Sequence, residues 1–144
     1  MYRSGKHLKI LTTLMLVGLC LGLAELAWAD LRFFSIVQQT CKSYRIPVTA
    51  QQMDLEESAE DVYDFTIALE SRRNNFEEVM LVGYIAVGNA IARTGLNVQT
   101  INITVTIPSA DNMLLMTTAN ASLVDQLRLG EVKSSDFMRQ LQWN

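Results

Sequence analysis

An uncharged run of fourteen residues, Val79–Ala92, constrains the fold of this chain more than any other segment. As an α-helix the run is about 21 Å long, because each residue adds about 1.5 Å, whereas the hydrocarbon layer of a bilayer is about 30 Å thick. Asn74 or Asn75 is a favoured residue at a helix start, and Gly95 is a favoured residue just past a helix end. The run therefore predicts a helix buried in the core of a folded domain, not a membrane span.

Small residues form a stripe along this predicted helix. Gly83, Ala86 and Ala90 recur at spacings of three and four, so one side of the helix would be smooth enough to approach a sheet closely. A second copy of the chain is the alternative partner for such a stripe. Tyr84 and Asn89 are the polar residues inside the run, and each needs a hydrogen-bond partner if it is buried. We interpret them either as structural polar anchors or as ligand contacts.

Two segments that flank the helix alternate with the period of a β-strand. In residues 63–70 and in residues 97–108, large apolar side chains alternate with polar or small ones, which predicts strands with one buried face. The apolar positions are Tyr63, Phe65, Ile67, Leu69, Ile101, Ile103, Val105 and Ile107. A turn over residues 108–112 and a weaker alternation over residues 113–122 complete a predicted β-hairpin.

Helices are predicted at both ends of the domain. Apolar residues at spacings of three and four predict a helix from about residue 31 to residue 45, which should end near Pro47. A short helix over residues 123–129 is predicted to be capped by Ser122, and a final helix is predicted from Ser134. The apolar side of the first helix would hold Leu31, Phe34, Val37, Cys41 and Tyr44, and the final helix would carry Phe137, Leu141 and Trp143 back to the core.

The predicted order of elements is therefore helix, strand, helix, strand, strand, helix. The strand-helix-strand unit should leave its two strands parallel, and the third strand should lie antiparallel beside the second. We predict an α+β fold of two layers, in which a small three-stranded mixed sheet with a β-α-β-β core is packed on one face by helices.

Charge clusters suggest two ion sites, and their surroundings disfavour both. Residues 54–64 hold six carboxylates, but the stretch lacks the glycine that an EF-hand loop needs, so we interpret it as a solvated acidic loop. Arg72 and Arg73 precede a helix start, where a phosphate could bind. Glu77 and Glu78 already balance the helix dipole there, and no glycine-rich loop comes before it.

The first 29 residues have the three parts of a secretory signal peptide. A basic leader with Arg3, Lys6 and Lys9 is followed by fifteen uncharged residues and by a small-x-small site at Ala27 and Ala29. Cleavage after residue 29 would leave residues 30–144 as a single small α+β domain in the periplasm or in the secreted fraction. The absence of a cysteine pair in so small an exported domain favours a bacterial periplasm.

Two alternatives to cleavage are disfavoured. An uncleaved anchor needs about 20 apolar residues, and Glu25 cuts this run short. A lipoprotein signal places Gly, Ala or Ser before the modified cysteine, whereas Leu19 precedes Cys20.

The composition of residues 30–144 excludes several functions. They hold 14 acidic and 9 basic residues, a net charge of −5. We therefore expect no nucleic-acid partner and, after leader removal, no membrane partner, since both are bound through clustered Lys and Arg. The only histidine, His7, lies in the leader, so histidine-dependent catalysis and histidine-ligated metal sites are excluded from the domain. We expect no cofactor and no metal. Cys41 is interpreted as a buried small residue, with an intermolecular disulfide as the alternative.

The second face of the predicted sheet is polar. It would carry Asp64, Thr66 and Glu70 from one strand and Asn102, Thr104 and Thr106 from the next. Our first hypothesis is an exported, non-catalytic interaction module that binds an envelope or secreted protein through this face or through a strand edge. The alternative interpretation is that the face is only hydrated, as one face of an antiparallel sheet often is.

Two further classes of function remain as alternatives. A small-ligand carrier would need a pocket between sheet and helix near Tyr84 and Asn89. A carboxylate-dependent hydrolase needs two close carboxylates. Asp64 and Glu70 share a strand face but lie about 20 Å apart, so a partner such as Asp111 would have to come from elsewhere. The sequence favours a non-catalytic protein over an enzyme.

Overall fold

The structure, a computed structural model, describes residues 28–72, 74–109 and 111–144. The predicted signal peptide therefore lies outside the described residues up to residue 27. The chain divides into two compact units, Met1–Leu31 and Arg32–Asn144, and the second unit holds the sheet.

The described residues form four α-helices and five strands. In chain order the elements are the N-terminal helix over residues 28–43, the 3₁₀ turn η1 (Ala50–Gln52), β1 (Met53–Ala59), β2 (Val62–Glu70), α2 (Phe76–Thr94), β3 (Val98–Ile107), β4 (Met113–Asn120), α3 (Ala121–Leu129), α4 (Ser134–Gln140) and β5 (Gln142–Trp143). The α+β class is confirmed.

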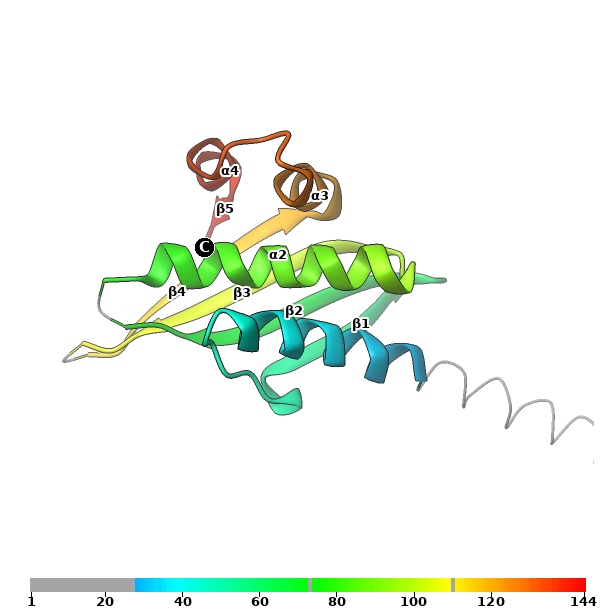
Figure 1. The fold of residues 1–144 in the computed structure, drawn as a ribbon, viewed down its shortest axis with the longest axis horizontal. Coiled ribbons are helices and arrows are strands. Elements are labelled where there is room, and N and C mark those ends of the chain that lie inside the picture. The colour runs from blue at the N-terminus through cyan, green and yellow to red at the C-terminus, as the bar shows by residue number, and fades with distance from the viewer. Residues whose placement is uncertain (1–27, 73, 110) are drawn as a thin grey trace, which may run out of the picture. The chain divides into compact units, whose positions relative to one another are not determined.

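The strands form one mixed sheet in the order β1-β2-β3-β4-β5 (Figure 1). β2 and β3 are parallel, β3 and β4 are antiparallel, and α2 connects the parallel pair. This part of the predicted topology is confirmed. The predicted number of three strands is wrong, because β1 is added at one edge and β5 at the other, both antiparallel to their neighbours.

β1 occupies the segment that we predicted to be an acidic loop. Met53 and Leu55 turn toward the helices beside Ile67 and Phe65, while Asp54 and the carboxylates that follow it are exposed. Charged side chains are common on an edge strand, because they discourage pairing with another chain. The many carboxylates led us to predict a loop here. The segment is a strand because its backbone forms hydrogen bonds with β2.

β5 is the second strand that the sequence did not predict. Phe137 and Leu141 are buried, as predicted for the last helix, but α4 ends at Gln140 and the chain then pairs with β4. Trp143 lies opposite Thr117 and keeps 47% of its surface exposed, so its predicted place in the core is wrong.

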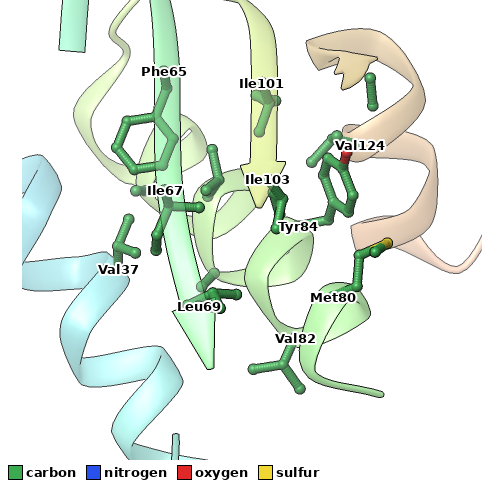
Figure 2. Packing of buried hydrophobic residues seen from close by; sticks show 14 of the residues in the cluster. Val37, Phe65, Ile67, Leu69, Met80, Val82, Tyr84, Ile101, Ile103 and Val124 are labelled. Carbon is green, nitrogen blue, oxygen red and sulfur yellow. The ribbon is translucent and has the colours of Figure 1, made fainter. Parts of the chain in front are cut away.

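All helices of the Arg32–Asn144 unit pack on one face of the sheet, and the core lies between the two layers. In Figure 2 the apolar side chains of β2 and β3 meet those of the N-terminal helix, α2 and α3. The fully buried side chains from the two strands are Phe65, Ile67, Leu69, Ile101, Ile103 and Val105. These are the inward positions that the alternation predicted.

The buried side of the N-terminal helix is rotated from the predicted one. Phe33 is completely buried, with its ring centroid 5.2 Å from that of Phe65, whereas Tyr44 is 53% exposed and Leu31 is 63% exposed. Val37 and Cys41 are buried, as predicted. Phe33 and Ile36 therefore take the places on the buried side that Leu31 and Tyr44 were predicted to hold, while Phe34 is half-buried beside the core.

α2 is the predicted core helix. It ends at Gly95, whose φ of 71° is the left-handed conformation that glycine adopts without strain. None of the helices in the described part of the chain combines the length and the hydrophobicity that a membrane span requires. The small-residue stripe is buried inside the domain. A Cβ atom built on Gly83 would lie 2.8 Å from Cδ1 of Leu69 and 2.9 Å from Cδ1 of Ile103.

The close approach at Gly83 can be tested by adding a branched side chain. We expect Gly83→Val to lower the free energy of unfolding by about 2 kcal/mol, because the new methyl groups would push into Leu69 and Ile103. Ala92→Val, on the exposed side of the same helix, is the control and should cost less than about 1 kcal/mol. Chemical denaturation measures both values, and equal losses would contradict this packing.

The cap of α3 differs from the prediction. Asn120 is the N-cap, and its Oδ1 accepts a hydrogen bond from the backbone N–H of Leu123 at 2.8 Å, while Ser122 lies inside the helix. The helix begins directly where β4 ends, so the last strand residue also serves as the cap.

Substitutions at the two candidate caps should therefore differ in effect. Asn120→Ala is expected to lower the free energy of unfolding by about 1 kcal/mol, since it leaves a helix N–H without its acceptor. Ser122→Ala should change it by less than about 0.5 kcal/mol. Thermal and urea unfolding give both numbers, and a larger loss for Ser122→Ala would overturn the assignment of the cap.

Candidate functional site

The open face of the sheet, which carries no helix, brings the predicted polar residues together. Thr66 lies directly opposite Asn102, while Thr104 and Thr106 follow along β3 opposite Ala68 and Glu70 of β2. Thr66 is exposed, and the three β3 residues are half-buried because strands flank them on both sides. Four side chains from two strands thus form one continuous polar surface at the centre of this face, and the whole face of the sheet opposite the helices is hereafter called the open face.

Thr118 of β4 extends the open face and was not among the predicted residues. Its hydroxyl donates to Oδ1 of Asn102 at 2.8 Å, and it lies beside Gln142 of β5. Asn144 Nδ2 lies 3.4 Å from the same hydroxyl. Alternation along β4 could have placed Thr118 on this face. The strand has apolar residues on both of its faces, however, so the sequence does not show which face is the polar one.

Charge changes in one direction across the open face. On β1 and β2 the outward residues include four carboxylates, and on β3 they are threonine and asparagine. On β4, Leu114 and Met116 point the same way as Thr118. Lys and Arg do not occur among the open-face positions of β1 to β4. The four carboxylates are Asp54, Glu56, Asp64 and Glu70. The surface is therefore acidic at one side, neutral in the middle and apolar at the other side.

Tyr84, a predicted polar anchor or ligand contact, lies in the core. It is completely buried, its hydroxyl is 2.9 Å from Oγ1 of Thr117, and its ring packs edge-on against Phe137. Figure 2 shows the ring between α2 and Val124 of α3. Burial raises the pKa of Tyr84 to about 12, and the Thr117 hydrogen bond opposes this rise only in part. Asn89, further along α2, is half-buried.

Three cavities lie away from these two residues. The first, of about 450 Å³, is at the β2–α2 junction and is lined by Arg45, Ser71 and Arg72 among others. The other two, of about 310 and 550 Å³, lie beside Asn120 and beside Lys42. Neither Tyr84 nor Asn89 lines any of the three. None of these three cavities therefore lies where the small-ligand carrier hypothesis predicts a pocket, beside Tyr84 and Asn89.

The junction cavity coincides with the predicted phosphate site. Arg72 lines it together with Arg45, which the sequence did not associate with the site because the two lie on separate segments. Arg73 lies outside the described residues. Glu70 also lines the cavity and would repel an anion. Groups of three or more residues able to hold a metal ion are absent from the part of the chain that the structure describes.

The remaining predicted groups are separate from one another. Asp64 and Glu70 both lie on the open face of β2, with two outward positions between them, and Asp111 belongs to the β3–β4 turn. Cys41 is completely buried, which confirms the first interpretation of this residue, and burial raises the pKa of its thiol to about 11. A thiol with that pKa stays protonated, and so poorly nucleophilic, at neutral pH.

Comparison of the chain with models of known protein families, with curated protein sequences and with solved structures gives no match.

The buried tyrosine predicts a specific dependence of stability on pH. The folded pKa, about 12, lies above the model value of 10.0, so Tyr84 contributes stability that is complete below pH 10 and is lost as the pH rises through 12. We expect Tyr84→Phe to be less stable than the wild type by about 1 kcal/mol below pH 10, because it loses the Thr117 hydrogen bond.

That difference should shrink between pH 10 and pH 12, where the wild type loses the tyrosine contribution and the variant has none to lose. Urea unfolding at a series of pH values measures it. A difference that stays constant or grows across this range would show that the phenol is not held in its neutral form by the fold. The two proteins differ only at residue 84, so the change in their difference with pH isolates the contribution of Tyr84.

Proposed function

We propose that this protein is an exported, non-catalytic binding module that holds a protein partner against the open face of its sheet. The main observation that supports this proposal is the uncovered polar surface formed by Thr66, Asn102, Thr104 and Thr106. The outward positions of the surrounding strands β1 to β4 include no Lys or Arg. The periplasm or the secreted fraction is the proposed location, in keeping with the predicted leader.

The side chains of the open face suit protein recognition. Threonine and asparagine both donate and accept hydrogen bonds, and on a strand they stand perpendicular to a rigid surface. The hydrogen bond between Thr118 and Asn102 holds two of them in fixed orientations. A partner would therefore meet donors and acceptors that are already ordered, which lowers the entropy lost on binding.

The charge distribution supports a basic partner. The carboxylates on β1 and β2 would attract Lys and Arg on the rim of the partner, and the neutral β3 would lie under its centre. Complementary charge at a rim raises the rate of association and selects the partner, while salt screens it. We therefore propose an envelope or secreted protein with a basic surface.

Affinity capture followed by substitution tests the proposal. The chain, expressed with its own leader in its native host and mildly cross-linked, should return one envelope or secreted protein in stoichiometric yield. The double variant Thr104→Lys, Thr106→Lys should weaken that complex by tenfold or more, about 1.4 kcal/mol, because two long side chains would block the centre of the open face.

Ser122→Lys with Gln126→Lys is the matched control, since it adds the same two charges to exposed positions of α3 in the helical layer. It should retain the complex, and circular dichroism should show both double variants folded. Binding should weaken as salt is raised from about 50 to 500 mM. Failure to capture a partner, or equal binding by both double variants, would overturn the proposal.

A further inference from the structure

The outer edge of β4 is only partly covered. β3 pairs with one side of this strand, and β5 pairs with the other side only at Thr117 and Thr118. Asn144 adds one bond, donating its backbone N–H to the carbonyl of Met116 at 3.0 Å. Within the described residues, no strand pairs with the outer edge of residues 113–115.

Leu114 directs its backbone groups toward this open edge. Its partner on β3 is Thr106, whose carbonyl accepts from the N–H of Ser71 and so points toward the β2 side. Both backbone groups of a residue in an antiparallel pair point to the same side, so Thr106 and Leu114 face away from each other. The outward carbonyl of Met116, two residues further on, agrees with this orientation. Leu114 therefore offers one donor and one acceptor at the edge.

The side chains at this edge are apolar and exposed. The exposed fractions are 56% for Met113, 55% for Leu114 and 44% for Met116. Charged residues, which usually protect an edge strand from association, are missing here, since Asp111 is the only charged residue between positions 94 and 124. The opposite edge of the same sheet, β1, is rich in carboxylates.

We propose that a second copy of this chain pairs with the open edge, with the two β4 strands antiparallel about a two-fold axis at Leu114. Each Leu114 would donate its N–H to the carbonyl of the other, and Met113 of each copy would lie opposite Leu115 of the other. β5 and Asn144 confine the contact to this short segment. One residue that carries both an outward donor and an outward acceptor is self-complementary, which is what a two-fold interface requires.

The charge distribution selects this edge for self-association. Two copies joined at β4 would place their acidic β1 strands at opposite ends of the joined sheet, while a contact through β1 would bring like charges together. The chain carries a net charge of −3, so a contact between identical copies is favoured where neither contributes charge. This inference is independent of the proposed function, because it uses backbone groups at the edge of the sheet.

Sedimentation equilibrium of the full chain, at about 5 to 500 µM, tests the proposal. The average mass should rise from one chain toward two in the wild type and stay at one in Leu114→Lys, because the two lysines would lie directly opposite each other at the two-fold axis and repel. Leu129→Lys is the matched control, since Leu129 is 54% exposed but lies on α3, and it should associate like the wild type. A wild type that stays monomeric, or a Leu114→Lys variant that still dimerises, overturns the proposal.

A cysteine at the axis gives a second readout. Two antiparallel residues in a hydrogen-bonded pair have Cα atoms about 5.5 Å apart, within the range that a disulfide spans. Leu114→Cys should therefore form a covalent dimer under mild oxidation, while the wild type and Leu129→Cys should not. Cys41 is buried and does not compete in the folded chain, and Cys20, which lies outside the described residues, is replaced by serine in all three proteins. Cross-linking of Leu129→Cys equal to that of Leu114→Cys would contradict the predicted axis.

Discussion

The contact between α2 and the two central strands is the constraint on which the rest of the structure depends. Gly83 lets the helix backbone lie directly over Leu69 of β2 and Ile103 of β3, where a Cβ atom would come within 2.8 and 2.9 Å of their Cδ1 atoms and force one of the side chains to shift. Because α2 also connects those strands, this contact holds the parallel pair in place. The N-terminal helix and α3 then pack beside α2, and their apolar sides complete one helical layer over the sheet.

One helical layer leaves the other face of the sheet uncovered, and the outward side chains suit that position. Along β3 the inward residues are isoleucine and valine, while Thr100, Asn102, Thr104 and Thr106 point outward. An apolar face of this size would aggregate, so polar outward residues are needed whatever the function. Two features of the open face go beyond what contact with water requires, and the proposed role in binding rests on them. Its outward positions on β1 to β4 include no Lys or Arg, and its charge changes from acidic on β1 to neutral on β3.

The two edge regions of the sheet differ in charge. β1 is exposed and acidic, which makes its free backbone groups a poor template for another strand. β4 is neutral, and the two-residue strand β5 protects only one end of it. Its exposed Leu114 and Met116 would be a liability in a monomer. A contact between two copies would pair the backbone of the edge and bring the two Leu114 side chains together, while Met116 lies outside the paired segment, beside Asn144.

The sequence by itself determined the central elements, because their side chains carry a period. The uncharged run of α2, its end at Gly95 and the alternation of β2 and β3 predicted the core, the parallel pair and the four clustered residues Thr66, Asn102, Thr104 and Thr106. Only the tertiary structure decided the edges. β1 and β5 are strands because a neighbour supplies their hydrogen bonds. The alternation in β1 lasts only from Met53 to Glu56 before a run of polar residues, and β5 has two residues, so neither segment carries a pattern long enough to predict a strand. The burial of Tyr84, the cap at Asn120 and the open edge at Leu114 likewise depend on which segments meet in space.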